Sequence, residues 1–150
     1  MTDIQSVTDL HRHFAARREL VYQAFTDEDQ IAAWFGPIGC WILRDSVSVD
    51  ARTGGHRRMK MVTYNDLRSW SINATFTEVI ENQRLVGYED VAGIPEFEGV
   101  DRFPFSQEFI DEGGGTRLEL RQGPYSTEME AVARESWLQS FIKLDALLAG

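Results

Sequence analysis

The stretch that decides the fold is TEMEAVARESWLQSFIKLDALLA, residues 127–149. Its apolar side chains recur at steps of three or four, which is the spacing that gives a helix one apolar face. The stripe consists of Met129, Ala133, Trp137, Phe141, Leu144 and Leu148, widened by Val132, Leu138 and Ile142. Thr127 and Glu130 have the spacing of a capping box, which favours a helix start at Thr127. A rod of roughly 33 Å needs a large apolar surface to cover it, and we expect Trp137 at the buried centre of that interface.

The rest of the chain predicts a sheet. Residues 5–14 have the alternation of a first strand, and two short helices follow. The first spans residues 18–25, and the second holds Ile31, Trp34 and Phe35, begins after a cap at Thr26-Asp27 and ends at Gly36-Pro37. Six further strand-like segments separated by turn residues are 41–49, 57–64, 70–79, 85–90, 103–110 and 116–122.

Short turns between consecutive strands are typical of an antiparallel sheet with one buried face. Gly123-Pro124 is expected to turn the chain from the last strand into the long helix. The predicted class is therefore α+β: a curved antiparallel sheet of about seven strands wrapped on a long C-terminal helix, with two short helices after the first strand. No linker or internal repeat divides the chain, so we predict a single domain over residues 1–150.

Composition and charge exclude several classes of protein. The net charge of −9 argues against a nucleic-acid partner, which needs a basic face against phosphates. One cysteine, Cys40, excludes an internal disulfide and a cysteine-based metal cluster. The sequence has no signal peptide and no apolar run long enough to span a bilayer, so we expect a cytoplasmic protein without membrane insertion.

The sequence offers no group of side chains with the spacing of a catalytic or metal site. His11 and His13 share the expected solvent face of the first strand, and His56 lies beside a turn. Cys40 has no histidine at a suggestive spacing, and the glycines of residues 113–115 lack the Lys-Ser/Thr of a phosphate loop. We therefore predict no catalytic residue, no metal and no cofactor.

A curved sheet that grips one helix commonly leaves a space between them, and such a space is a natural ligand site. Large side chains on the inner faces either line this space or simply fill the core. The residues expected to line it are Phe14, Trp34, Phe35, Arg57, Met59, Met61, Trp70, Ile72, Phe76, Glu78, Glu89, Phe105, Gln107, Phe109, Met129, Trp137 and Phe141. Its rim is expected at Trp34-Phe35 and at the acidic, mobile loop of residues 91–101, whose flanking acids Glu89, Asp90, Glu96, Glu98 and Asp101 are interpreted as solvated.

Arg57 is the unusual residue of this set. It is in phase with Met59 and Met61, so its side chain should point inward, where its charge is costly without a partner. Glu78 and Glu89 also fall on the inner side of their strands by alternation, so either carboxylate could make a bidentate contact with the Arg57 guanidinium. In the alternative interpretation, Arg57 extends past the rim into water, because it follows a glycine turn closely.

Four groups of residues resemble the signatures of a known family. Residues 27–37, which end in WFGP, and residues 50–55, DARTGG, look like its two N-terminal signatures. Residues 113–120 look like its glycine hairpin, and Gly123-Pro124 with Trp137 looks like its terminal helix. The family is that of the homologues of the activator of heat-shock protein 90 ATPase, within the START-related, polyketide-cyclase-like (SRPBCC) superfamily of helix-grip folds.

The resemblance implies a helix-grip domain over nearly the whole chain. Its members include a co-chaperone domain, and the wider superfamily offers a cavity for lipids, polyketides or other apolar molecules. The chain departs from the family pattern at Arg17, which replaces a usual proline, at Ser136, which replaces a frequent glycine, and at Arg57, which replaces an inward apolar residue.

We therefore expect a domain that holds an apolar or amphipathic small molecule between sheet and helix. The first alternative is a protein-interaction module of the co-chaperone type, with a chaperone or other protein as partner. The second is an enzyme of the cyclase or hydrolase kind. An enclosed pocket with a few polar groups would favour the ligand, whereas a filled interior beneath a broad exposed apolar patch would favour the protein partner.

Overall fold

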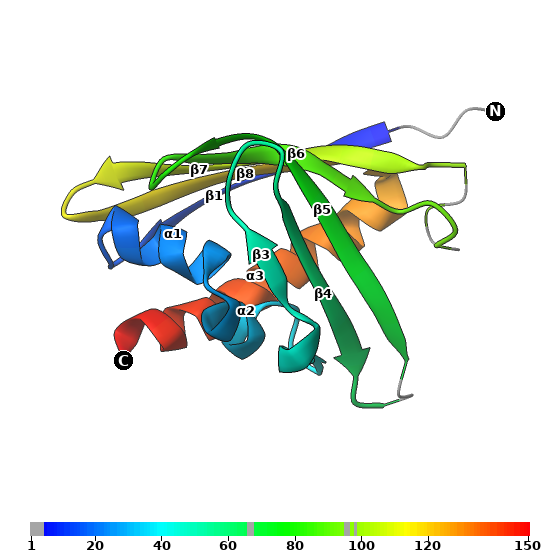
Figure 1. Ribbon diagram of the computed structural model, residues 1–150, viewed down its shortest axis with the longest axis horizontal. Coiled ribbons are helices and arrows are strands. Elements are labelled where there is room, and N and C mark those ends of the chain that lie inside the picture. The colour runs from blue at the N-terminus through cyan, green and yellow to red at the C-terminus, as the bar shows by residue number, and fades with distance from the viewer. Residues whose placement is uncertain (1–4, 66–67, 95–96, 98) are drawn as a thin grey trace.

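Strands and helices follow one another in the predicted order in the computed structural model, which describes residues 5–65, 68–94, 97 and 99–150. The sheet curls over α3, and α1 and α2 pack beside one end of that helix (Figure 1). None of the helices in these ranges is long and apolar enough to cross a bilayer. The elements are β1 (Gln5–Phe14), α1 (Arg18–Thr26), α2 (Glu28–Trp34), β2 (Cys40–Ile42), the 3-10 helix η1 (Arg44–Ser46), β3 (Ser48–Asp50), β4 (His56–Thr63), β5 (Ser69–Ile80), β6 (Arg84–Asp90), β7 (Arg102–Glu112), β8 (Gly115–Ser126) and α3 (Thr127–Ala149).

The sheet is antiparallel with the strand order β1-β8-β7-β6-β5-β4-β2, and β3 also pairs with β4. Seven strands therefore lie side by side, as predicted, but the segment 41–49 is not one strand. The turn Arg44–Ser46 divides it into β2 and β3, which both pair with β4. The Ser46 hydroxyl donates to the Leu43 carbonyl and accepts from the Lys60 amide, so local polar bonds replace the sheet ladder at this point.

The predicted turn at Gly123-Pro124 is instead a bulge inside β8. Tyr125 lies opposite Ser6, and Gln122 lies opposite Thr8, so two residues of β8, Gly123 and Pro124, face one residue of β1, and the strand continues to Ser126. The cap of α3 moves accordingly, because the Ser126 hydroxyl, not that of Thr127, accepts from the Met129 amide at 3.1 Å. The cap predicted at Asp27 is present, with its carboxylate accepting from the Gln30 amide.

A second bulge changes the phase of β5. Phe76 lies opposite Gly87 but Glu78 lies opposite Val86, so one residue is added between them. Glu78 consequently points outward and pairs with Arg84 at 2.8 Å, and the prediction that it faces the cavity is wrong. Gly87 is required at this crossing, because a Cβ there would lie 1.9 Å from the Thr75 carbonyl oxygen.

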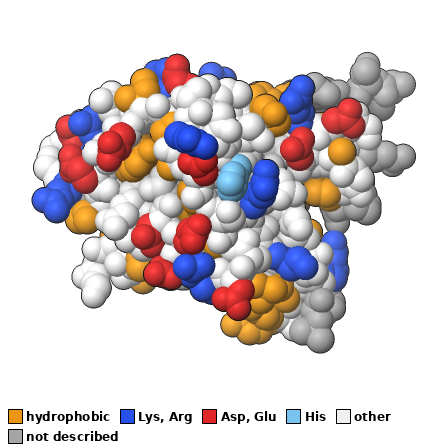
Figure 2. Space-filling model, viewed as in Figure 1, with side chains coloured by type: hydrophobic (Ala, Val, Ile, Leu, Met, Phe, Trp, Pro, Cys, Tyr) orange, Lys and Arg blue, Asp and Glu red, His pale blue; other side chains and the backbone are white. Residues whose placement is uncertain are grey.

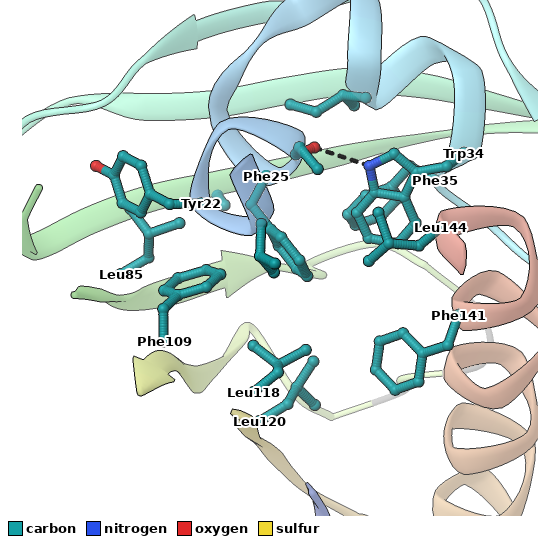
Figure 3. Close-up of a cluster of buried hydrophobic side chains, with 14 of the residues drawn as sticks. Tyr22, Phe25, Trp34, Phe35, Leu85, Phe109, Leu118, Leu120, Phe141 and Leu144 are labelled. Atoms are coloured by element: carbon teal, nitrogen blue, oxygen red, sulfur yellow. Dashed lines mark hydrogen bonds between the residues drawn. The ribbon is translucent and has the colours of Figure 1, made fainter. Parts of the chain in front are cut away.

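The C-terminal half of α3 covers the packed part of the core. Phe141 and Leu144 are fully buried, and Figure 3 shows them facing the side chains of Phe25, Leu118 and Leu120 across the space between helix and sheet. The ring of Phe141 meets Phe14 edge-to-face with centroids 5.6 Å apart. Trp34 is also fully buried, and its indole N–H donates to the Ala24 carbonyl at 2.7 Å (Figure 3).

The apolar stripe of α3 is narrower than its sequence predicts. Val132, Leu138 and Ile142 are 55%, 43% and 58% exposed, so the side chains expected to widen the stripe are not packed in the core. Trp137 is only partly buried, which corrects its expected place at the buried centre. That centre lies one turn further along, at Phe141, because the sheet stands away from the first half of the helix and leaves a cavity there.

Candidate functional site

A cavity of about 620 Å³ lies between the sheet and the first half of α3. The ends of β4 and β5, the β6–β7 connection and the segment after α2 supply its other walls. Gly36 sits where the chain leaves α2, with φ +102°, and a Cβ there would lie 2.8 Å from the Met61 side chain. The lining residues are Phe35, Gly36, Pro37, Met61, Thr63, Arg68, Ser69, Trp70, Ser71, Ile72, Glu89, Gly93, Ile94, Phe97, Phe103, Gln122, Tyr125, Met129, Val132, Ala133, Ser136, Trp137 and Ser140.

The structure brings seven of the predicted lining residues together on this wall: Phe35, Met61, Trp70, Ile72, Glu89, Met129 and Trp137. Ten others lie elsewhere: Phe14, Trp34, Arg57, Met59, Phe76, Glu78, Phe105, Gln107, Phe109 and Phe141. Apart from Glu78, they are buried behind the wall or in the packed half of the core. The physical reason is that the alternation along a strand shows which side chains lie on the concave face of the sheet. It does not show which end of that face packs tightly against the helix.

Sequence reasoning missed the aromatic lining at the loop. Phe103 and Tyr125 are buried there with Val91, and Phe97 packs on both rings, with centroid distances of 5.5 and 5.9 Å. Phe103 alternates in phase with Phe105, so the strand pattern contained the signal for it. Tyr125 carries no such signal, because it follows the predicted turn at Gly123-Pro124 and reaches the inner face only through the bulge in β8.

The loop of residues 91–101 has apolar side chains on its cavity side. The Val91 amide donates to the Asp101 carbonyl at 2.8 Å and closes the loop at its base. Ile94 and Phe97 line the cavity, in agreement with the expected rim. Of the acids expected to flank the loop, Asp90 and Asp101 are exposed, and Glu96 and Glu98 lie outside the described residues.

Arg57 points inward and is only 4% exposed. Its Nη1 donates to the Phe25 carbonyl and to the Gln107 side-chain oxygen, each at 3.2 Å. Its guanidinium also lies 5.6–5.7 Å from the ring centroids of Phe35, Phe76 and Phe105. The expected carboxylate contact is absent among the described residues, so neutral oxygens and aromatic faces solvate this charge instead.

Glu89 is the carboxyl group of the cavity wall. The register places Arg57, Ala74, Glu89 and Phe103 in one row across β4, β5, β6 and β7. Burial raises the pKa of Glu89 to about 7, although the positive charge of Arg57 lowers it and the negative charge of Asp90 adds to the rise. Burial likewise lowers the pKa of Arg57 to about 10, so that Arg57 stays charged while Glu89 titrates near neutral pH.

Gln122 connects the helix to the phenol of Tyr125. The indole N–H of Trp137 donates to the Gln122 side-chain oxygen at 3.0 Å. Tyr125 is buried, and burial raises the pKa of its phenol far above its ordinary value, with the charge of Glu89 adding to this effect. A side-chain hydrogen bond with Gln122 opposes the rise. The phenol therefore stays neutral, and the cavity has a polar corner within largely apolar walls.

The histidines lie away from this site. His11 contacts Arg117 and His13 contacts Glu112, both on the exposed face of β1, and His56 contacts Ser48. In the part of the chain that the structure describes, no group of three or more His, Cys, Asp or Glu could hold a metal ion. The cavity itself can hold the apolar body of a ligand, and a few of its side chains can form hydrogen bonds with that ligand.

Residues 15–149 match the family described as activator of Hsp90 ATPase homolog 1-like protein. A crystal structure of a Chromobacterium violaceum protein is similar, with a TM-score of 0.82, 24% identity and coverage of 96% of this chain and 97% of that one. The AHSA1 protein of Silicibacter pomeroyi has a TM-score of 0.75, 24% identity and coverage of 96% and 98%. An AHSA1-like protein of Aeromonas hydrophila has a TM-score of 0.76, 20% identity and coverage of 95% and 94%. No curated protein matches the chain.

Proposed function

The chain belongs to the family of activator of Hsp90 ATPase homolog 1-like proteins, and we propose that it binds an apolar or amphipathic small molecule in the cavity beneath the first half of α3. The observation that carries this proposal is the cavity itself. Its volume of about 620 Å³ lies within the usual range for small-molecule sites. Its aromatic and aliphatic lining, with a smaller number of polar groups that include Glu89, Gln122 and Tyr125, favours a ligand with an apolar body.

The test is a thermal-shift titration with long-chain and aromatic compounds, together with native mass spectrometry of freshly purified protein. A ligand that binds only the native state raises Tm with its concentration. Ala133→Phe should abolish the shift, because residue 133 lines the cavity. The matched control is Ala131→Phe, since Ala131 is exposed on the same helix and outside the cavity wall. Equal shifts in both variants, or no shift with any compound, would refute the proposal.

A second candidate function is a protein-interaction role. The outer side of α3 carries two large exposed apolar residues, Leu138 and Ile142. Ile38 is 60% exposed and lies next to them, because its amide donates to the side-chain oxygen of Gln139. Figure 2 shows another face of the molecule, on which acidic and basic side chains are interspersed.

The family description suggests the assay for this second function. The ATPase rate of an Hsp90 chaperone would be measured with the wild-type chain and with a Leu138→Glu/Ile142→Glu variant. Stimulation that only the wild type gives would support a partner surface on α3. An unchanged rate, together with ligand-induced thermal shifts, would leave ligand binding as the function.

A further inference from the structure

Glu89 is the one acidic side chain that lines the cavity among the residues that the structure describes. It lies on β6, where the register places it between Ala74 of β5 and Phe103 of β7. Neither of these neighbours has a polar side chain. A carboxylate on an apolar wall is costly unless it has a partner, so a binding site is a place where such a group has a use.

Arg57 lies in the same row of the sheet but is not the direct partner of Glu89. It is two strands away, about 10 Å between the backbones, and it lies outside the cavity wall. Its guanidinium donates to the Phe25 carbonyl and to the Gln107 side-chain oxygen, and no ion pair joins it to Glu89 within the described ranges. Arg57 therefore weakens the field of the carboxylate from behind the wall, and a molecule in the cavity meets the carboxylate itself.

The walls around this carboxyl are rich in aromatic rings. Phe103, the neighbour of Glu89 in the sheet, has its ring centroid 5.0 Å from that of Tyr125. On the helix side, the ring of Trp137 meets that of Phe35 at 5.5 Å. All four rings line the cavity. The face of an aromatic ring is its negative part, and it attracts a cation that has left water, such as a quaternary ammonium group.

Resting on the proposed ligand-binding function, we propose that the ligand is an organic cation, an apolar body with an ammonium group, and that the Glu89 carboxylate binds this ammonium among the aromatic rings. The net charge of −9 attracts a cation over long range and repels an anion. Arg68 is the one basic side chain on the described wall. It lies six residues before Ala74, about 20 Å along an extended strand, so an ammonium bound at Glu89 is well separated from it.

The affinity for a cation should follow the ionisation of Glu89. The ionisable groups on the neighbouring elements are Arg57 on β4, Asp90 on β6, Tyr125 on β8 and, on α3, Glu130 with its partner Arg134. Arg57 stays charged and Tyr125 stays neutral near pH 7, whereas the pKa of Glu89 is about 7. The carboxyl therefore repels no cation when it is protonated, but attracts one only when it is ionised.

The experiment compares two fluorescent probes of the same shape. (Naphthalen-2-ylmethyl)trimethylammonium carries the cation, and 2-(2,2-dimethylpropyl)naphthalene has a carbon atom in place of the charged nitrogen. At pH 8, Glu89→Gln should weaken binding of the cation about tenfold and change that of the neutral probe by less than about twofold. Glu135→Gln is the matched control, because it removes the same charge from an exposed site on α3 outside the cavity wall, and it should change neither affinity.

A pH titration gives a second readout, which a merely structural role of Glu89 would not produce. The wild-type affinity for the cation should rise about tenfold from pH 6 to pH 8, because the ionised fraction of Glu89 rises from about a tenth to about nine-tenths. Glu89→Gln should abolish this dependence, and the neutral probe should show none in either protein.

Three outcomes separate the inference from the proposed function. Unchanged affinity of Glu89→Gln for the cation would overturn the cation inference while leaving ligand binding intact. Tighter wild-type binding of the anion naphthalen-2-ylmethanesulfonate than of the cation would overturn it in the same way. Failure of all three probes to bind would overturn the proposed function and this inference together.

Discussion

In the C-terminal half of α3, Phe141 and Leu144 are fully buried, whereas Met129 and Trp137 in the N-terminal half are only partly buried and line the cavity. One apolar stripe continues through both halves. The difference comes from what lies opposite. The aromatic side chains of α1 and α2 join the sheet beneath the C-terminal half and fill the space (Figure 3). Beneath the N-terminal half, the sheet and the loop of residues 91–101 leave the space open.

An apolar helix face therefore has two possible uses in this protein. At the packed end, apolar side chains stabilise the fold by burial against one another. At the cavity end, they form a wall whose remaining exposed area a ligand can bury. The following predictions test that division, beginning with the largest effect.

Phe141→Ala should lower the free energy of unfolding by about 3–5 kcal/mol, because it leaves a void in a fully packed core. Trp137→Ala should cost less, about 1–2 kcal/mol, since its ring is partly exposed and the space beside it already exists. Urea denaturation of the two variants measures both values. Equal losses would mean that the two halves of α3 are packed alike.

The carboxyl of Glu89 should make the stability of the cavity end depend on pH. Its pKa in the folded protein, about 7, exceeds the ordinary value of 4.5, so the folded state holds this proton more tightly than the unfolded state does. The protonated Glu89 carboxyl therefore contributes about 3 kcal/mol to the free energy of unfolding. This contribution is fully present below about pH 4.5 and is lost as the pH rises through 7. Arg57 keeps its charge throughout this range, and Tyr125 stays neutral.

The measurement compares wild type with Glu89→Gln, which keeps the shape and removes the titration. The variant's stability relative to wild type should increase by about 2–3 kcal/mol between pH 5 and pH 8. A pH-independent difference between wild type and Glu89→Gln would show that the carboxyl is well solvated in the folded protein.

Enlarging a small residue should have opposite consequences at the two ends. Ala24→Leu, in the packed core, should lower the free energy of unfolding by about 1–3 kcal/mol, because added methylene groups have no room. Ala133→Leu, on the cavity wall, should leave it within about 0.5 kcal/mol, since the side chain can enter the open space. A large loss at residue 133 would indicate that the cavity is closed in solution.

Much of the fold could be predicted from local patterns. The cap at Asp27, the alternation of β5 before its bulge and the stripe of α3 all depend on residues close in sequence. The inward position of Arg57 also followed from such a pattern, through its phase with Met59 and Met61. Chain-local alternation and helical spacing reflect backbone geometry, so they are visible without knowledge of any partner strand.

The predicted side-chain positions were wrong where pairing with a segment distant in the sequence determines which face a residue occupies. Glu78 left the inner face because pairing with β6 adds a residue to β5, and Tyr125 entered it because pairing with β1 carries β8 past Gly123-Pro124. The neutral partners of Arg57 come from α1 and β7, which no spacing around Arg57 could indicate.

Local sequence patterns specify the order of elements, the inner face of most strands and the helix that the sheet grips. Which end of that helix is packed and which is open depends on how distant segments meet in the folded chain. The physical reason is that a periodic pattern specifies the direction of each side chain, whereas a cavity is a balance of volumes contributed by α2, the sheet and the loop of residues 91–101, and these meet only in the folded protein.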